Sequence, residues 1–228
     1  DRDLHESTAL LPEKWGGAGL FQIPLAALIP EKVDGLLAAE KNISVSRLVN
    51  GATRLHPVTM LTGQAAGAAA ALAVKQNVQP RQLRAQDVQA ALLAAHDHLS
   101  LFSFEDAPEY AKVWSGVEAA ILYEYMDPRS DRIFGVDDEM HWIEVRDAFR
   151  RAFGLGRPLP ARDDLAPLTR AEFGAWLTEY YGKEAGAYQA LIDGETEDKP
   201  LTKGQLAASV WKAMQVPPAD QTVKKKKK

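Results

Sequence analysis

Apolar residues recur at helical spacing over most of the chain. The clearest stretch spans 59–76 and holds seven alanines between Ala65 and Ala73. Alanine has the highest helix propensity, so this stretch predicts a long helix. The same spacing predicts shorter amphipathic helices at 86–96, 114–125, 142–153, 170–181, 184–191 and 203–214.

Two short apolar runs near the start of the chain predict buried strands instead. They are Leu20-Phe21-Gln22-Ile23-Pro24 and Gly35-Leu36-Leu37-Ala38-Ala39, and each is bounded by proline or glycine. Strand-like runs disappear beyond 104–108 and aromatic-bearing helices follow. The pattern therefore predicts a helix-rich α+β protein with domains at 1–104 and 105–223, ending in a lysine tail at 224–228.

Two of the expected helices begin with the same pattern, 33 residues apart. Leu168-Thr169-Arg170-Ala171-Glu172-Phe173 and Leu201-Thr202-Lys203-Gly204-Gln205-Leu206 each place a threonine three residues before a glutamate or glutamine. This arrangement predicts a capping box, in which the two side chains satisfy each other's backbone N–H groups. The stretch 134–145 has the same frame without the threonine. Stacked helical units are one interpretation, and three unrelated capped helices are the other.

Composition and charge exclude several classes of protein. With 46% hydrophobic and 25% charged residues, the chain is neither disordered nor collagen-like. Without the five terminal lysines it carries 22 basic and 31 acidic residues, a net charge of −9, which argues against nucleic-acid binding. The absence of cysteine excludes disulfides, thiolate catalysis and zinc–thiolate sites. The tail itself is interpreted as a solvated end or a cloning remnant, with attraction to anionic surfaces as the alternative.

Membrane and processing signals are expected to be absent from the chain. The longest apolar run, 58–74, is interrupted by threonine, glycine and glutamine, so no transmembrane span is predicted. The sequence opens at Asp1 without a charged-then-apolar leader, which favours a processed product or a fragment.

The segment 50–67 carries the most suggestive chemistry, because a loop there feeds a helix whose first turns are rich in glycine and alanine. The start of a helix carries unpaired N–H groups that attract an anion or a polarised carbonyl. Gly63 and Gly67 lower the helix propensity, so they require a reason such as the close approach of a ligand. Tight packing of the helix on a sheet is the alternative explanation.

Four blocks in this region resemble the C-terminal end of FAD-dependent oxidoreductases of the xanthan-lyase-associated type: 21–30, 33–44, Arg54-Leu55-His56-Pro57 and 63–67. The resemblance implies that the strand through Leu36–Ala39 returns to a Rossmann-like FAD-binding lobe. It also implies that the 63–67 helix start faces the flavin. The FAD-binding residues implied are Asn42, Gly51, Arg54, Pro57, Gly63, Gln64, Ala65, Ala66 and Gly67. Many members have glycine where this chain has Glu40.

No Gly-x-Gly-x-x-Gly follows a predicted strand, so the loop that binds the dinucleotide phosphates is missing from these 228 residues. The family resembled places that loop in an N-terminal half. We therefore expect FAD in the complete protein, little retention of FAD by this chain alone, and oxidoreductase activity only when the chain is joined to that half. No catalytic residue is assigned.

The helical region resembles a degenerate S-layer homology module, an all-α array of helical repeats. The resemblance rests on 117–123, on 134–138 and on the starts at 168–173 and 201–206. It implies binding of cell-wall polysaccharide by Arg170 and Lys203, and an envelope or extracytoplasmic location, with a cytoplasmic one left open. The alternative function is thus a non-catalytic envelope module that binds polysaccharide or protein. No metal site is predicted, since His96 and His98 do not share a helix face.

Overall fold

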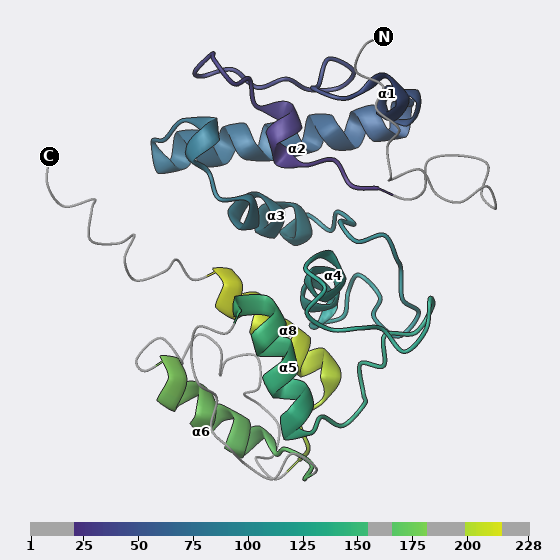
Figure 1. Cartoon of the computed structure of the whole chain (residues 1–228), viewed down its shortest axis with the longest axis vertical. Coiled ribbons are helices and arrows are strands. Elements are labelled where there is room, and N and C mark those ends of the chain that lie inside the picture. The colour runs from purple at the N-terminus through teal and green to yellow at the C-terminus, as the bar shows by residue number, and fades with distance from the viewer. Residues whose placement is uncertain (1–20, 155–165, 182–198, 216–228) are drawn as a thin grey trace, which may run out of the picture. The chain divides into compact units, whose positions relative to one another are not determined.

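The computed structural model describes residues 21–154, 166–181 and 199–215, and in these ranges helices joined by loops make up the chain (Figure 1). Contacts divide the chain into two compact units, Asp1–Ala95 and His96–Lys228. The first unit contains η2 (Leu25–Leu28), α1 (Arg47–Thr53), α2 (His56–Gln76), η3 (Pro80–Gln82) and α3 (Ala85–Ala94). The second contains α4 (Trp114–Leu122), α5 (Trp142–Phe153), α6 (Arg170–Tyr181) and α8 (Lys203–Gln215).

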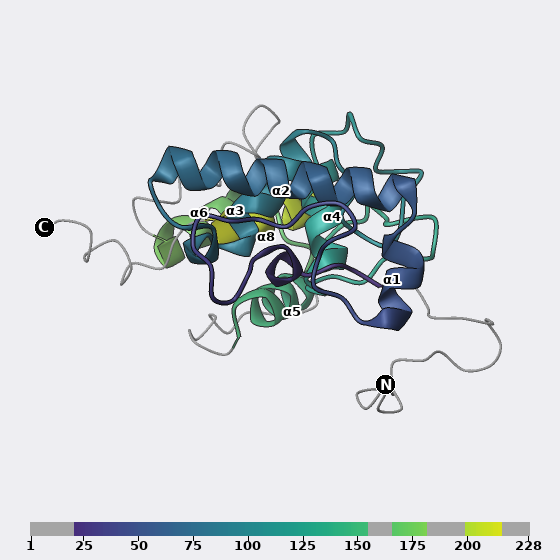
Figure 2. The same ribbon diagram turned by 90° about the horizontal axis from the view of Figure 1, so that it is seen from above.

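Helix α2 is the scaffold of the first unit, and residues 21–45 run along it in both views (Figures 1 and 2). It contacts α1, η2, η3 and α3. The buried positions follow helical spacing and are all small: Thr59, Thr62, Ala66, Ala69 and Ala73. Small side chains let the neighbouring backbone approach the helix closely. The predicted helix at 59–76 is therefore confirmed, with its start three residues earlier.

The predicted α+β fold class is wrong for the described residues, which contain helices and isolated bridges but no strand or sheet. In place of the first strand, 21–24 are irregular and η2 follows; 36–39 are irregular too. Ala38 donates to Leu28 O at 2.8 Å and Ser44 donates to Ala27 O at 2.9 Å. A strand needs a neighbour with a continuing row of donors and acceptors, and η2 offers single bonds. The apolar runs thus form loops without a Rossmann-like sheet, and none of their described residues is fully buried.

Helix α1 lies in a segment where the sequence predicts a loop. Its residues have modest helix propensity, and Gly51 lowers it further. The helix begins because the Ser46 side chain accepts the Val49 N–H at 3.3 Å. It is anchored by Thr53, which is buried. Capping and burial together outweigh the weak local preference.

In the second unit, α4 and α8 cross at very close range. A Cβ built on Gly116 would overlap the backbone N and Cα of Ala208 and lie 2.7 Å from Ala207 C. The buried Tyr125 hydroxyl lies 2.9 Å from Gly116 O and 3.0 Å from Ala207 O, so it also ties the two helices together. Burial raises the pKa of Tyr125 well above its ordinary value, and the hydroxyl stays a donor.

Three helix starts meet in a ring of backbone hydrogen bonds. Met140 N donates to Leu201 O at 2.9 Å, Leu201 N to Leu168 O at 2.7 Å, and Leu168 N to Met140 O at 2.9 Å. Each of these three residues immediately precedes the N-cap residue of its helix, α5, α6 or α8. The three positions are therefore equivalent around a closed ring.

The capping boxes predicted at two of these starts are confirmed. Thr169 N donates to Glu172 Oε2 at 3.0 Å and Glu172 N to Thr169 Oγ1 at 3.2 Å. Thr202 and Gln205 make the same pair of bonds at 3.0 and 3.4 Å. The start of α5 is similar without threonine, since His141 N donates to Glu144 Oε2 at 2.8 Å.

The sequence places a domain boundary near 104–108, whereas contacts divide the chain after Ala95. That boundary stays a prediction, because compactness alone does not show where the chain folds independently. The predicted helix at 184–191 and the tail at 224–228 lie outside the described residues.

Among the described helices, α2 is long and apolar enough to cross a membrane by length and composition, with a mean hydropathy of 1.3. About 28% of its most apolar window is buried. Core helices of soluble proteins have the same composition. The predicted absence of a transmembrane span therefore stays a prediction.

Candidate functional sites

The corner between α1 and α2 gathers three of the residues singled out in the sequence. Gly51 lies in the last turn of α1, Arg54 caps that helix, and Pro57 lies in the first turn of α2. The corner is tight because Arg54 N donates to Asn50 O and Leu55 N to Ala52 O, both at 3.2 Å. Gly51, Arg54 and Pro57 are exposed.

The start of α2 has no side-chain cap. Its N-cap is Leu55, which has no acceptor in its side chain, and Pro57 has no N–H to contribute. The first N–H groups, those of His56 and Val58, therefore point out of the helix with no protein acceptor among the described residues. Arg54 adds a positive charge beside them. This combination attracts negative or strongly polar groups.

The two glycines of α2 have free space above them. A Cβ built on Gly63 or Gly67 would meet no described atom within 4 Å, and the same holds for Gly51. Tight packing against the described part of the protein therefore does not explain these glycines. Gln64 is exposed and Ala65 half-buried, whereas Ala66 lies on the buried side of the helix.

A turn at 40–42 lies against α2 near the glycines. The Thr62 hydroxyl is 3.4 Å from Glu40 O, and Asn42 in the same turn is exposed. Glu40 has φ 61°, in the left-handed region that favours glycine. This conformation explains why glycine suits the position in the resembled oxidoreductases. The glutamate here keeps the turn at some cost in strain.

Large apolar side chains on the exposed side of α2 were missed at the sequence level. Met60 is 74% exposed, Leu61 53% and Val74 81%, on a helix whose other side is buried. The sequence could have indicated their exposure, because these residues fall outside the helical series 59, 62, 66, 69 and 73 that packs inward. Together with the glycines they form an open, largely uncharged helix face.

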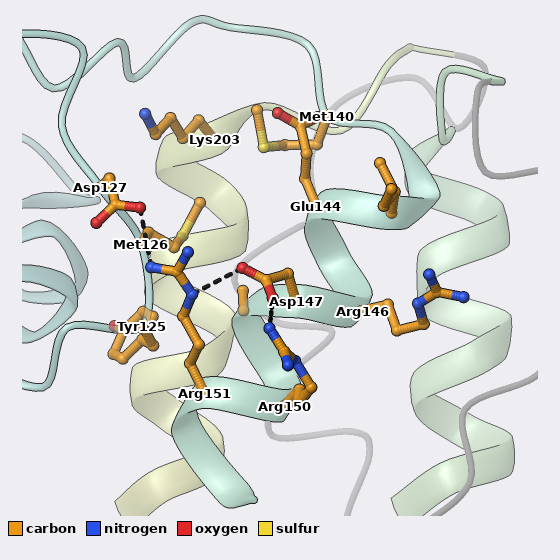
Figure 3. A pocket seen from close by; sticks show the side chains of 12 residues that line it. Tyr125, Met126, Asp127, Met140, Glu144, Arg146, Asp147, Arg150, Arg151 and Lys203 are labelled. Carbon is orange, nitrogen blue, oxygen red and sulfur yellow. Dashed lines mark hydrogen bonds and ion pairs between the residues drawn. The ribbon is translucent and has the colours of Figure 1, made fainter. Parts of the chain in front are cut away.

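The second unit contains a cavity of about 700 Å³ beside α5 and the start of α8 (Figure 3). Its rim is crossed by ion pairs. Arg151 lies 2.9 Å from Asp127 and 2.7 Å from Asp147, and Arg150 pairs with Asp147 as well. The hydrogen bond to Asp127 raises the pKa of Arg151, and the hydrogen bond from Arg150 lowers the pKa of Asp147. These charges neutralise one another.

Lys203 also lines the cavity, and none of the ion pairs on the rim includes it. Its Nζ lies 4.8 Å from the centre of the Phe134 ring, and among the described residues no carboxylate lies within 4.0 Å of it. Burial lowers the pKa of Lys203. A half-buried ammonium without an ion-pair partner favours an anionic ligand in the cavity.

Arg170, the other candidate for polysaccharide binding, occupies the equivalent position on α6. It is only 6% exposed, so it is not a solvated first-turn side chain. Trp142, which holds the third equivalent position, is buried too. Of the three positions, Lys203 alone lines the cavity. In the described ranges no group of three His, Asp or Glu side chains could hold a metal ion.

Comparison with known protein families gives a match, and it covers most of the first unit. Residues 1–92 match the family model of FAD dependent oxidoreductases. This match supports an FAD-dependent oxidoreductase region at the start of the chain and implies FAD in the complete protein. No curated protein and no solved structure matches the chain.

The residues of the oxidoreductase region fit part of an FAD site. The uncapped start of α2 and Arg54 supply donors and positive charge for a polar or anionic group. Gly63 and Gly67 leave space for a flat ring or a sugar chain against the helix. A G-x-G-x-x-G loop for the pyrophosphate does not occur in the 228 residues. The described part of the region therefore fits one side of the cofactor.

Proposed function

We propose that the oxidoreductase region holds one side of an FAD cofactor, and that a polypeptide segment outside these 228 residues supplies the dinucleotide-phosphate loop. The observation that carries this proposal is the open glycine face of α2 within the matched residues 1–92. The order of the four sequence blocks favours the xanthan-lyase-associated type within the family.

In this proposal the protein residues bind and orient the cofactor. The start of α2 and Arg54 face its polar edge, while Gly51, Gly63 and Gly67 admit its flat part. Gln64, on the exposed side between the glycines, can hydrogen-bond a polar group of the ring or its ribityl chain. Bound flavin supplies hydride and electron transfer, which no side chain of this chain could provide.

Replacing the glycines separates a structural role from a cofactor role. We expect Gly63→Ala and Gly67→Ala each to raise the free energy of unfolding by about 0.5–1 kcal/mol, because alanine favours helix and its Cβ meets no described atom. In the polypeptide that joins this chain to a phosphate loop, both changes should lower flavin retention, measured by absorbance in the flavin bands.

Lys75→Ala, on the same helix about five turns from the corner, is the matched control and should keep the flavin. If the alanine variants are more stable and keep full flavin content, the glycines do not face the cofactor. If the longer polypeptide binds no flavin even with the wild-type sequence, the proposed cofactor role of the whole region is wrong.

A second candidate function is carried by the ring of three capped helix starts and the cavity beside it. The ring and its equivalent caps support the S-layer-homology resemblance. The Lys203 ammonium, which has no carboxylate within 4.0 Å among the described residues, supports an acidic ligand. We propose that the second unit is an interaction module for acidic cell-wall polysaccharide, working at the cell envelope. The two candidates concern different units of the chain.

The test of this candidate is a pull-down with purified cell-wall polysaccharide. Lys203→Gln should reduce binding about tenfold, because it removes a half-buried cavity cation that has no carboxylate within 4.0 Å among the described residues. Lys212→Gln, an exposed lysine on the same helix α8, should bind like the wild type. Equal binding by both variants, or no binding by the wild type, would contradict the polysaccharide role.

A further inference from the structure

The first residues of the second unit are tied to α4 by a buried carboxylate. Glu118 Oε2 accepts the backbone N–H groups of Leu99 and Ser100, both at 2.9 Å. The Glu118 side chain is only 3% exposed. A carboxylate withdrawn this far from water depends on its donors and on opposite charge nearby.

His98 lies between this carboxylate and a second one. Its Nδ1 is 3.3 Å from Glu118 Oε1, and its Nε2 is 3.0 Å from Glu109 Oε1. Ionised carboxylates only accept hydrogen bonds, and a neutral imidazole has a single N–H. Only the protonated imidazolium can therefore donate to both partners at once.

Among the residues that the structure describes, no second basic side chain compensates the charge of Glu118. Within the described residues, His98 is the basic group that lies within 4.0 Å of this carboxylate. The Ser100 hydroxyl is 3.0 Å from Oε1, but it is closer to Phe102 O, at 2.6 Å, and has one proton to donate. The Oε1 atom thus depends mainly on His98.

We propose that His98 is a protonation-dependent latch, which holds residues 98–100 on α4 while its ring is charged and loosens them as the pH rises. Histidine is the side chain whose charge changes between about pH 5 and 8 in ordinary surroundings. When the proton is lost, the pair with Glu109 or with Glu118 loses its hydrogen bond. The buried Glu118 carboxylate is then left with hydrogen bonds from uncharged donors only, among the residues described.

The surroundings of His98 provide a matched control. Trp114 of α4 packs between two histidines: His98 meets its ring edge-on at 5.5 Å, and His96 stacks on it at 5.7 Å. The charged groups beside the latch are Glu109, Glu118 and, next in the chain, Asp97. His96 contacts the same indole ring without either glutamate.

Amide hydrogen exchange across pH 5 to 8 tests the latch in the intact chain. The protection of the Leu99 and Ser100 amides, corrected for the intrinsic exchange rate at each pH, should fall roughly three- to tenfold as the pH rises. The amides of Gly135 and Val136, which bond to Asp106 in the same unit, are the internal reference and should change little.

Two variants decide the origin of the effect. His98→Gln should show low, pH-independent protection at Leu99 and Ser100, because glutamine carries no charge. His96→Gln should keep the wild-type pH dependence. The proposal is overturned if the wild type shows no fall, if His98→Gln retains the fall, or if the reference amides fall equally, since the whole unit would then be opening.

Discussion

Gly116→Ala is expected to destabilise the second unit by about 3 kcal/mol. The added Cβ would overlap the backbone of Ala208 and lie 2.7 Å from Ala207 C. Backbone atoms cannot rotate away as a side chain can, so α4 and α8 must separate. The separation would also pull Tyr125 from the two carbonyls it bridges.

Denaturant unfolding followed by circular dichroism and tryptophan fluorescence measures this loss. Ser115→Ala, one position earlier on α4 and only half-buried, should stay within about 0.5 kcal/mol of the wild type. A Gly116→Ala protein as stable as Ser115→Ala would show that the two helices are not in close contact.

Asp106→Asn should cost the second unit about 2–3 kcal/mol, because charged groups make the stronger hydrogen bonds in proteins. The Asp106 carboxylate accepts three consecutive N–H groups, from Phe134 at 2.9 Å, Gly135 at 2.6 Å and Val136 at 2.9 Å. Asparagine offers one acceptor oxygen and turns an NH₂ group toward the remaining donors. Asp137→Asn, at an exposed neighbouring position, is the control and should change stability little.

The same carboxylate gives the unit a defined dependence on acid. Burial on its own would raise the pKa of Asp106, but the three backbone donors outweigh it and hold the pKa below the ordinary value of 3.8. A lowered folded-state pKa contributes stability above the unfolded pKa, and this contribution is lost as the pH falls through the folded value. The free energy of unfolding of the wild type should therefore fall as the pH is lowered into the acid range. In Asp106→Asn the free energy of unfolding should depend less on pH. Identical acid profiles would contradict the role of Asp106.

The candidate sites were partly visible in the sequence. The glycines at 63 and 67 lower helix propensity without any local benefit, so the sequence could show that something must approach the helix. It could not show that this space is free of the described protein, because that depends on which neighbours pack against α2. The cavity beside Lys203 is formed by α5, the 125–127 segment and α8, which are distant in the sequence. Its existence therefore depended entirely on the tertiary fold.

The sequence by itself determined the helices α2, α4, α5, α6 and α8 and the caps at Thr169 and Thr202, because propensity, apolar spacing and capping act within a few residues. It misjudged the apolar runs around Leu20–Pro24 and Gly35–Ala39. Whether such a run becomes a strand depends on a partner strand with free donors and acceptors. The tertiary structure supplied a 3₁₀ turn and single hydrogen bonds instead. It also decided that Thr53 would be buried and anchor α1, and that three separate helix starts would close into one ring.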